Sequence, residues 1–204
     1  MEFALLFLPL LASITSGFFG KFIGDRNSEI VTSLFVSISA LLSLILFYQV
    51  IVSGYENNVV IATWINSGTL NVNWSIKVDT LSSVMLVVVT LVSSLVHIYS
   101  IGYMSHDPHK PRFMAYLSLF TFAMLTLVTS DNFLQLFFGW EGVGLCSYFL
   151  IGFWFKKDSA NAAAIKAFVV NRVGDFGFAL GIFLIFYLFG TVNYSEVFQQ
   201  IPQI

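Results

Sequence analysis

Six apolar stretches, each long enough to cross a lipid bilayer, are the feature that most constrains the fold of this chain. A hydrocarbon core about 30 Å thick needs about 20 apolar residues in a helix. Only 10% of the 204 residues are charged, whereas a soluble domain carries about 25%. The sequence therefore predicts an all-α polytopic membrane protein with a single transmembrane domain over residues 1–204. Its predicted helices are Phe3–Phe22, Ile30–Val52, Asp79–Met104, Arg112–Ser130, Asn132–Phe155 and Ser159–Phe189.

The longest connection between the predicted helices, Ser53–Val78, contains two runs rich in β-branched and aromatic residues. The runs flank the turn-forming segment Asn66–Gly68, and the second run alternates apolar with polar residues. Alternation with a period of two, bounded by turn residues, predicts a β-hairpin, here over Val59–Val78. Such a hairpin is suited to cap the helix bundle or to bind a neighbouring subunit; an ordered interhelical loop is the alternative.

Basic residues divide the connections into two sets. With antiparallel helices, the first, third and fifth connections lie on one side and the others on the opposite side, where Lys77 is the sole basic residue. Since basic connections stay on the cytoplasmic or matrix side, we expect the N-terminus and the hairpin on the other, extracytoplasmic side. The basic residues of the first set are Lys21, Arg26, Lys110, Arg112, Lys156 and Lys157.

Composition argues against several other classes of protein. The net charge of −2 gives no reason to expect a nucleic-acid partner. Cys146 is the only cysteine, so neither an intrachain disulfide nor a cysteine-held iron–sulfur cluster is expected. His106 and His109 are too few ligands for a metal site, and glycine-rich nucleotide or flavin motifs are missing. We therefore expect neither a cofactor nor a metal in this chain.

Glu141 is an acidic residue in the middle of a predicted membrane helix. It lies nine residues past Asn132, about 14 Å along the helix at 1.5 Å per residue. An ionisable group at such a depth costs about 2.5–3.5 kcal/mol on insertion scales, so its default interpretation is an ion or proton pathway. Neighbouring glycines let another helix or water approach the carboxylate. The alternative is that Glu141 only pairs with a lysine or arginine and fixes helix packing.

The sixth predicted helix carries three further charged residues, Lys166, Arg172 and Asp175. Arg172 and Asp175 are three residues apart, so they are neighbours on one helix face. They are predicted proton-pathway residues, and an intrahelical ion pair that lowers insertion cost is the alternative. Lys166 either faces internal water or extends its amine to the interface. Asp175 lies deeper and is the better relay candidate. In the third helix, a neutral His97 satisfied by a helix neighbour is expected, and proton handling is the alternative.

Two segments resemble a known family. These are Phe138–Tyr148, FGWEGVGLCSY, and Ala163–Asp175, AAIKAFVVNRVGD, supported by His97–Met104, HIYSIGYM. They are similar to the largest antiporter-like membrane subunits of respiratory complex I, the L subunit or subunit 5 of NADH-quinone oxidoreductase. The resemblance covers essentially the whole chain and implies an antiporter-like fold. Because that family has many more helices, the chain is expected to be an incomplete, N-terminal part of it.

The resemblance also assigns roles by position. Glu141 matches the family's essential glutamate, which pairs with a lysine on a seventh helix that would follow Ile204. Asp175, Arg172 and Lys166 match polar positions that support the same proton half-channel. Asn171 stands where the family would be expected to have threonine.

The implied function is a non-redox, proton-translocating subunit of the NADH:quinone oxidoreductase enzyme. NADH, FMN, iron–sulfur clusters and quinone would then be bound by other subunits. Its partners would be the lipid bilayer and other membrane subunits of complex I, especially a neighbouring antiporter-like subunit. Its location would be the bacterial inner membrane or the mitochondrial inner membrane. Mrp-type cation/proton antiporters share the fold and much of the motifs and are the first alternative; a purely structural membrane subunit is the second.

Overall fold

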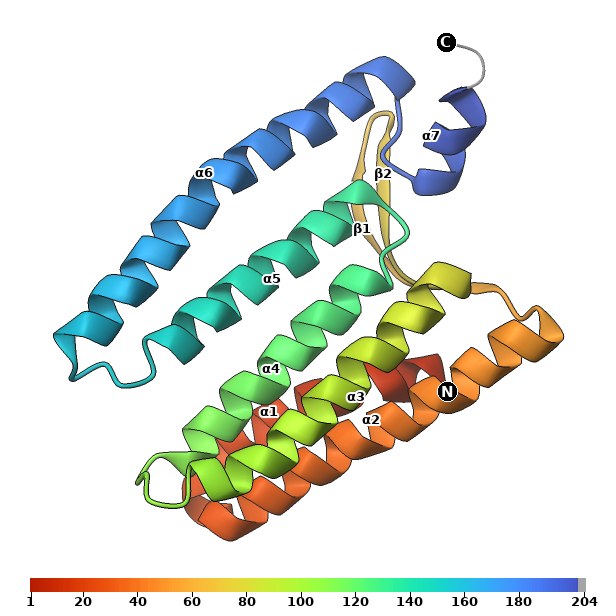
Figure 1. Cartoon of the computed structure of the whole chain (residues 1–204). Coiled ribbons are helices and arrows are strands. Elements are labelled where there is room, and N and C mark those ends of the chain that lie inside the picture. The colour runs from red at the N-terminus through yellow and green to blue at the C-terminus, as the bar shows by residue number, and fades with distance from the viewer. Residues whose placement is uncertain (202–204) are drawn as a thin grey trace.

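The chain folds into seven helices and one β-hairpin in the described residues, Met1–Ile201, of a computed structural model (Figure 1). Six of these helices are long and apolar enough to cross a membrane. This confirms the predicted multi-pass helical fold with a hairpin between the second and third helices. The elements are α1 (Glu2–Ile23), α2 (Asp25–Ser53), β1 (Asn57–Ser67), β2 (Leu70–Val78), α3 (Thr80–Tyr103), α4 (Lys110–Val128), α5 (Phe133–Ile151), α6 (Asp158–Phe189) and α7 (Tyr194–Gln200).

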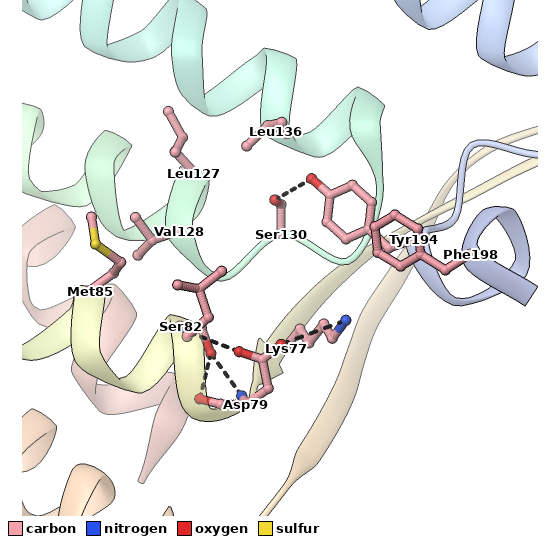
Figure 2. A pocket seen from close by; sticks show the side chains of 11 residues that line it. Lys77, Asp79, Ser82, Met85, Leu127, Val128, Ser130, Leu136, Tyr194 and Phe198 are labelled. Carbon is pink, nitrogen blue, oxygen red and sulfur yellow. Dashed lines mark hydrogen bonds and ion pairs between the residues drawn. The ribbon is translucent and has the colours of Figure 1, made fainter. Parts of the chain in front are cut away.

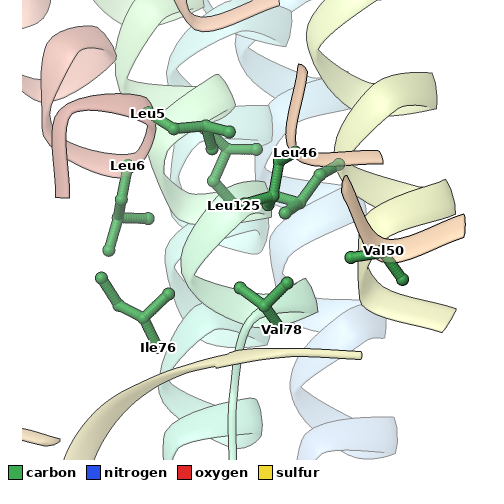
Figure 3. Packing of buried hydrophobic residues seen from close by; sticks show 8 residues of the cluster. Leu5, Leu6, Leu46, Val50, Ile76, Val78 and Leu125 are labelled. Carbon is green, nitrogen blue, oxygen red and sulfur yellow. The ribbon is translucent and has the colours of Figure 1, made fainter. Parts of the chain in front are cut away.

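Helices α1 to α4 form a bundle, α5 packs along α4, and α6 packs along α5 as the outermost helix (Figure 1). The apolar core of the bundle is closed at one end by the hairpin. There Ile76 and Val78 of β2 contact buried leucines of α1, α2 and α4 (Figure 3). The α1–α2, α3–α4 and α5–α6 connections lie together at the opposite end. The three basic connections therefore share one end of the molecule, as the antiparallel arrangement requires.

Two helix boundaries differ from the predicted ones by more than one helical turn at one end. Helix α2 begins at Asp25 instead of Ile30 because its polar first turns are part of the packed bundle: Ser28 and Glu29 are buried. Helix α5 ends at Ile151 instead of Phe155. Beyond it the Phe153 ring packs on α4, and its carbonyl oxygen accepts a hydrogen bond from Arg112. The short helix α7 was not predicted.

Capping side chains fix the starts of α3 and α5. Asp79 accepts a hydrogen bond from the Ser82 backbone N–H at 2.8 Å, and the Ser82 hydroxyl accepts one from the Asp79 backbone N–H (Figure 2). Asn132 caps α5 in the same way by accepting from the Gln135 backbone. A mainly apolar cavity of about 490 Å³ lies between α3, α4 and α7 near Lys77 (Figure 2).

The hairpin is fastened to α5 by the side chain of Gln135. Strands β1 and β2 pair antiparallel around a tight turn, in which Gly68 adopts φ 59°. The Gln135 amide accepts from the Ser75 backbone N–H at 2.9 Å and donates to the Ser75 carbonyl at 2.7 Å. Gln135 is fully buried. Its amide bonds both the backbone N–H and the C=O of Ser75, the two groups that a further strand would otherwise pair. The hairpin and the start of α5 are thereby joined.

Candidate functional site

Three charged side chains meet between α5 and α6. Arg172 of α6 forms a hydrogen-bonded ion pair with Glu141 of α5. The same guanidinium lies 3.6 Å from the carboxylate of Asp175, one turn along its own helix. The structure thus brings together three of the four residues predicted to carry the chemistry. With Trp140, described next, we name this group the α5–α6 charge cluster.

Trp140 is the member of the cluster that sequence reasoning missed. Its indole N–H donates to Asp175 Oδ1 at 2.7 Å, so a second polar contact joins the two helices. A tryptophan in an apolar helix needs a partner for its N–H, and Trp140 directly precedes Glu141. That adjacency was the available signal, but the partner depends on how α5 and α6 are rotated.

The two carboxylates have different surroundings. The Asp175 side chain is 8% exposed and both of its oxygens have a partner, Trp140 on one and Arg172 on the other. The Glu141 side chain is 24% exposed. One of its oxygens binds Arg172, and the other is enclosed without a hydrogen-bond partner among the described residues. Glu141 is therefore the carboxylate with a free position for a proton or a water molecule.

Lys166 does not join this cluster. It is exposed on α6, and no hydrogen bond or salt bridge to it occurs within residues 1–201. Its neighbours on the outer face of α6 are also exposed, among them Val169, Val170 and Val173. His97 lies elsewhere, in the bundle, where it is fully buried and bonded to Ser118 of α4. His106 and His109 belong to no group of three or more possible metal ligands in the described part of the chain.

Two family models match the chain. One, described as NADH-Ubiquinone oxidoreductase (complex I), chain 5 N-terminus, covers residues 64–114. The other, described as NADH:quinone oxidoreductase/Mrp antiporter, TM, covers residues 130–204 and so includes the whole charge cluster. The fold and the models define the class: an antiporter-like membrane subunit.

Curated relatives make the assignment more specific. NADH-ubiquinone oxidoreductase chain 5 of Triticum aestivum is 58% identical over 97% of this chain, and that of Chondrus crispus is 54% identical over 99%. NADH-quinone oxidoreductase subunit L of Rickettsia bellii (strain RML369-C) is 51% identical over 98%. The chain belongs to this chain 5/subunit L family, as the motifs predicted. It spans about 30% of the length of these relatives.

Solved structures share the fold at lower identity. A chain of the membrane-bound sulfane sulfur reductase, an archaeal respiratory membrane complex, superposes with a TM-score of 0.82 at 19% identity, over 97% of this chain and 39% of that chain. A chain of the Mrp complex from Dietzia sp. DQ12-45-1b gives 0.79 at 23% identity, over 96% and 20%. These likenesses establish the antiporter-like fold.

Proposed function

We propose that this chain supplies part of a proton-translocating membrane subunit of NADH-quinone oxidoreductase. The α5–α6 charge cluster is the observation that carries the proposal. Acid and base placed together between membrane helices are costly and typical of ion or proton pathways. The relatives' names support a place in complex I, and the chain is a multi-pass membrane protein with membrane-subunit relatives.

The charge balance of the cluster suggests how it handles a proton. Two carboxylates and one guanidinium leave one net negative charge when all are ionised. A proton on the free oxygen of Glu141 neutralises the group, and Arg172 then has Asp175 as its remaining anionic partner. Since uncompensated charge is unfavourable in a low-dielectric region, proton binding and the position of Arg172 are expected to be coupled. Glu141 is thus the proposed proton-binding group, and Arg172 and Asp175 are its electrostatic partners.

The remaining parts of the proposal concern the whole complex. The chain performs no redox step; NADH, FMN, iron–sulfur clusters and quinone are bound by other subunits. A neighbouring antiporter-like subunit is its partner, and the basic connections face the cytoplasm or matrix. Lys166 is proposed to serve the same pathway from the outer face of α6. The alternative function, a Mrp-type cation/proton antiporter, is supported by the wording of one family model and by the Mrp structural likeness.

Replacing Glu141 with glutamine in the full-length protein of an assembled complex tests the proposal. The amide keeps the shape but cannot bind a proton, so we expect quinone-coupled proton pumping to fall sharply while assembly is preserved. Glu56→Gln, the same change at an exposed carboxylate between α2 and β1, is the matched control and should pump normally. Normal pumping by Glu141→Gln would contradict the proposal. A strict sodium requirement would favour the antiporter alternative.

A further inference from the structure

A second acid–base pair lies in the bundle, at the end that carries the basic connections. Glu29 of α2 is 7% exposed. The amine of Lys110, at the start of α4, lies 3.9 Å from its Oε1. This separation is too long for a hydrogen bond. The charges compensate one another, but they leave hydrogen-bonding positions unused.

Unsatisfied polar atoms gather around this pair. Among the described residues, Glu29 Oε1 and the buried hydroxyls of Ser28 and Ser33 have no hydrogen-bond partner. Buried polar groups are nearly always bonded, and such exceptions commonly mark ordered water. All three lie within a short stretch of α2, so we infer a hydrated site between α2 and α4 rather than scattered defects.

A cavity lies beside this site, at the end of the molecule. It has a volume of about 450 Å³ and lies between the ends of α1, α2 and α4, with Gly20, Lys21 and Arg112 in its wall. The Ser28 hydroxyl faces this wall, 3.6 Å from the position that a Cβ on Gly20 would occupy. The hydrated site is therefore next to an opening on the side of the basic connections.

His97 lies deeper in the same bundle and has one basic nitrogen available. Its Nδ1 is 2.7 Å from the Ser93 carbonyl oxygen, which can only accept, so Nδ1 carries the hydrogen. Nε2 is then unprotonated and accepts from the Ser118 hydroxyl at 3.0 Å. An incoming proton would bind Nε2 and give an imidazolium, and the Ser118 hydroxyl would rotate from donor to acceptor.

Hydroxyl groups line the interval between the two sites. Glu29, Ser33 and Ser37 recur every four residues along α2, and the Ser37 hydroxyl lies 2.8 Å from that of Ser94 on α3. Ser94 precedes His97 by three residues. Residues three or four apart on a helix have Cβ atoms about 5–6 Å apart, an interval that one water molecule can bridge between hydroxyls.

We propose that Glu29 and Lys110, with Ser28 and Ser33, form a second proton-binding site, which exchanges protons with His97 through Ser37, Ser94 and the Ser118 hydroxyl that faces Nε2, with water between them. This route is separate from the α5–α6 charge cluster and rests on the proposed function for its role in pumping. The charged side chains of α2 and α4 all lie at its outer end, namely Asp25, Arg26, Glu29, Lys110 and Arg112. A proton from the bulk solvent reaches Glu29 through water at the cavity, and Glu29 holds it as a carboxylic acid beside the Lys110 amine.

Four single variants of the full-length protein in the assembled complex test the route. In Glu29→Gln and His97→Gln the amide keeps donor and acceptor atoms but cannot carry the proton. Ser43→Ala is the matched control, because it removes an interhelical hydroxyl pair of the same kind, Ser43 with Thr90 at 2.7 Å. Glu141→Gln reports on the proposed function. Protons translocated per quinone reduced are measured in proteoliposomes.

We expect Glu29→Gln and His97→Gln to lower this ratio and Ser43→Ala to leave it unchanged. If Glu29→Gln and His97→Gln both translocate as many protons per quinone as the unchanged protein, the route is overturned. The proposed function then still stands, provided that Glu141→Gln fails to pump. A loss only in Glu29→Gln would remove His97 from the route. If Glu29→Gln does not assemble, the protonated-carboxyl infrared band of the parent complex must change in Lys110→Gln; an unchanged band counts against the site.

Discussion

Arg172 is the residue on which the charge cluster depends, because it serves acids on two helices. The planar guanidinium offers five N–H donors in a fixed fork, so it can bind Glu141 across the α5–α6 interface while staying near Asp175. Its flat face also lies over the Phe168 ring, with 4.7 Å between the guanidinium carbon and the ring centroid. A lysine would provide one point charge instead of this fork.

Removing Arg172 should do more harm than removing Asp175. Arg172→Ala leaves two carboxylates facing one another without a cation, whereas Asp175→Asn leaves the Glu141 pair intact. We expect lower assembly of the complex in Arg172→Ala, measured by native gel electrophoresis, and partial recovery in Arg172→Ala/Asp175→Asn, because breaking one half of a pair costs more than removing both. Recovery should be partial since Glu141 still lacks its partner; purely additive loss would show that the two residues are not coupled.

Some of this geometry was predictable from the sequence. The three-residue spacing of Arg172 and Asp175, and the mid-helix depth of Glu141, already indicated that an acid and a base share one level of the membrane. The contact of Trp140 with Asp175 and the outward position of Lys166 could not be predicted. Both depend on the rotation of α6 about its axis, and the apolar residues of α6 are spread around the helix, so its sequence indicates no clear buried face.

Helices α4 and α5 approach closely at Gly139. A Cβ at this position would lie 2.7 Å from the backbone of Leu127, a distance that real Cβ atoms essentially never show. On α5, Gly144 has nothing within 4 Å of its corresponding position. The glycines of the motif therefore have different roles: Gly139 is needed for the close approach of α4 and α5, whereas Gly144 is not.

Gly139→Ala should destabilise the protein, and Gly144→Ala is its matched control. Overpacking of this kind typically costs about 1–3 kcal/mol, so we expect a lower midpoint of thermal unfolding in detergent for Gly139→Ala. Gly144→Ala should leave the midpoint near that of the parent. Equal midpoints for Gly139→Ala and the parent would mean that α4 and α5 can move apart to admit the methyl group without loss of stability.

The α3–α4 and α5–α6 connections are tied together by Asp107. Trp154 donates to its carboxylate through the indole N–H at 2.9 Å, and the His109 backbone donates at 2.8 Å. Burial acts to raise the pKa of the Asp107 carboxyl, but these hydrogen bonds outweigh it, aided by the charges of His109 and Arg112. The pKa is held below its ordinary value of 3.8.

The hydrogen bonds to the Asp107 carboxylate should weaken only in acid. Because the folded-state pKa of Asp107 is lowered, its stabilising effect is present above the ordinary pKa and is lost as the pH falls through the folded-state value. We expect the NMR resonance of the Trp154 indole N–H to shift in that acidic range and to show no such titration in Asp107→Asn. A titration that persists in Asp107→Asn would assign the change to another group.

At the scale of elements, apolar length and turn residues were enough to predict the six long helices and the hairpin. The boundaries that moved did so through tertiary contacts. The polar start of α2 stays helical because Ser28 and Glu29 are buried in the bundle, and α5 stops early where Arg112 binds the Phe153 carbonyl. Neither contact can be predicted from the periodicity of apolar residues in the sequence.

For the whole molecule, the arrangement of basic connections predicts its orientation in the membrane. A cysteine at Asn27, in the exposed start of α2, and one at Asn66, near the exposed hairpin turn, lie at opposite ends. In a background with Cys146 replaced by alanine, we expect an impermeant thiol reagent to label them from opposite sides, with Asn66 on the extracytoplasmic side. Labelling of both from one side would reject this topology.

The pairing of charges between α5 and α6 has a consequence for biogenesis. Arg172 and Asp175 would each oppose membrane insertion of α6, by about 2.5–3.5 kcal/mol at the helix centre. Glu141 and Trp140, which bind them, are on the preceding helix, and only residues 152–157 separate the two helices. The two segments are therefore expected to leave the translocon together as a helical hairpin, with α6 poorly inserted when it is synthesised without α5.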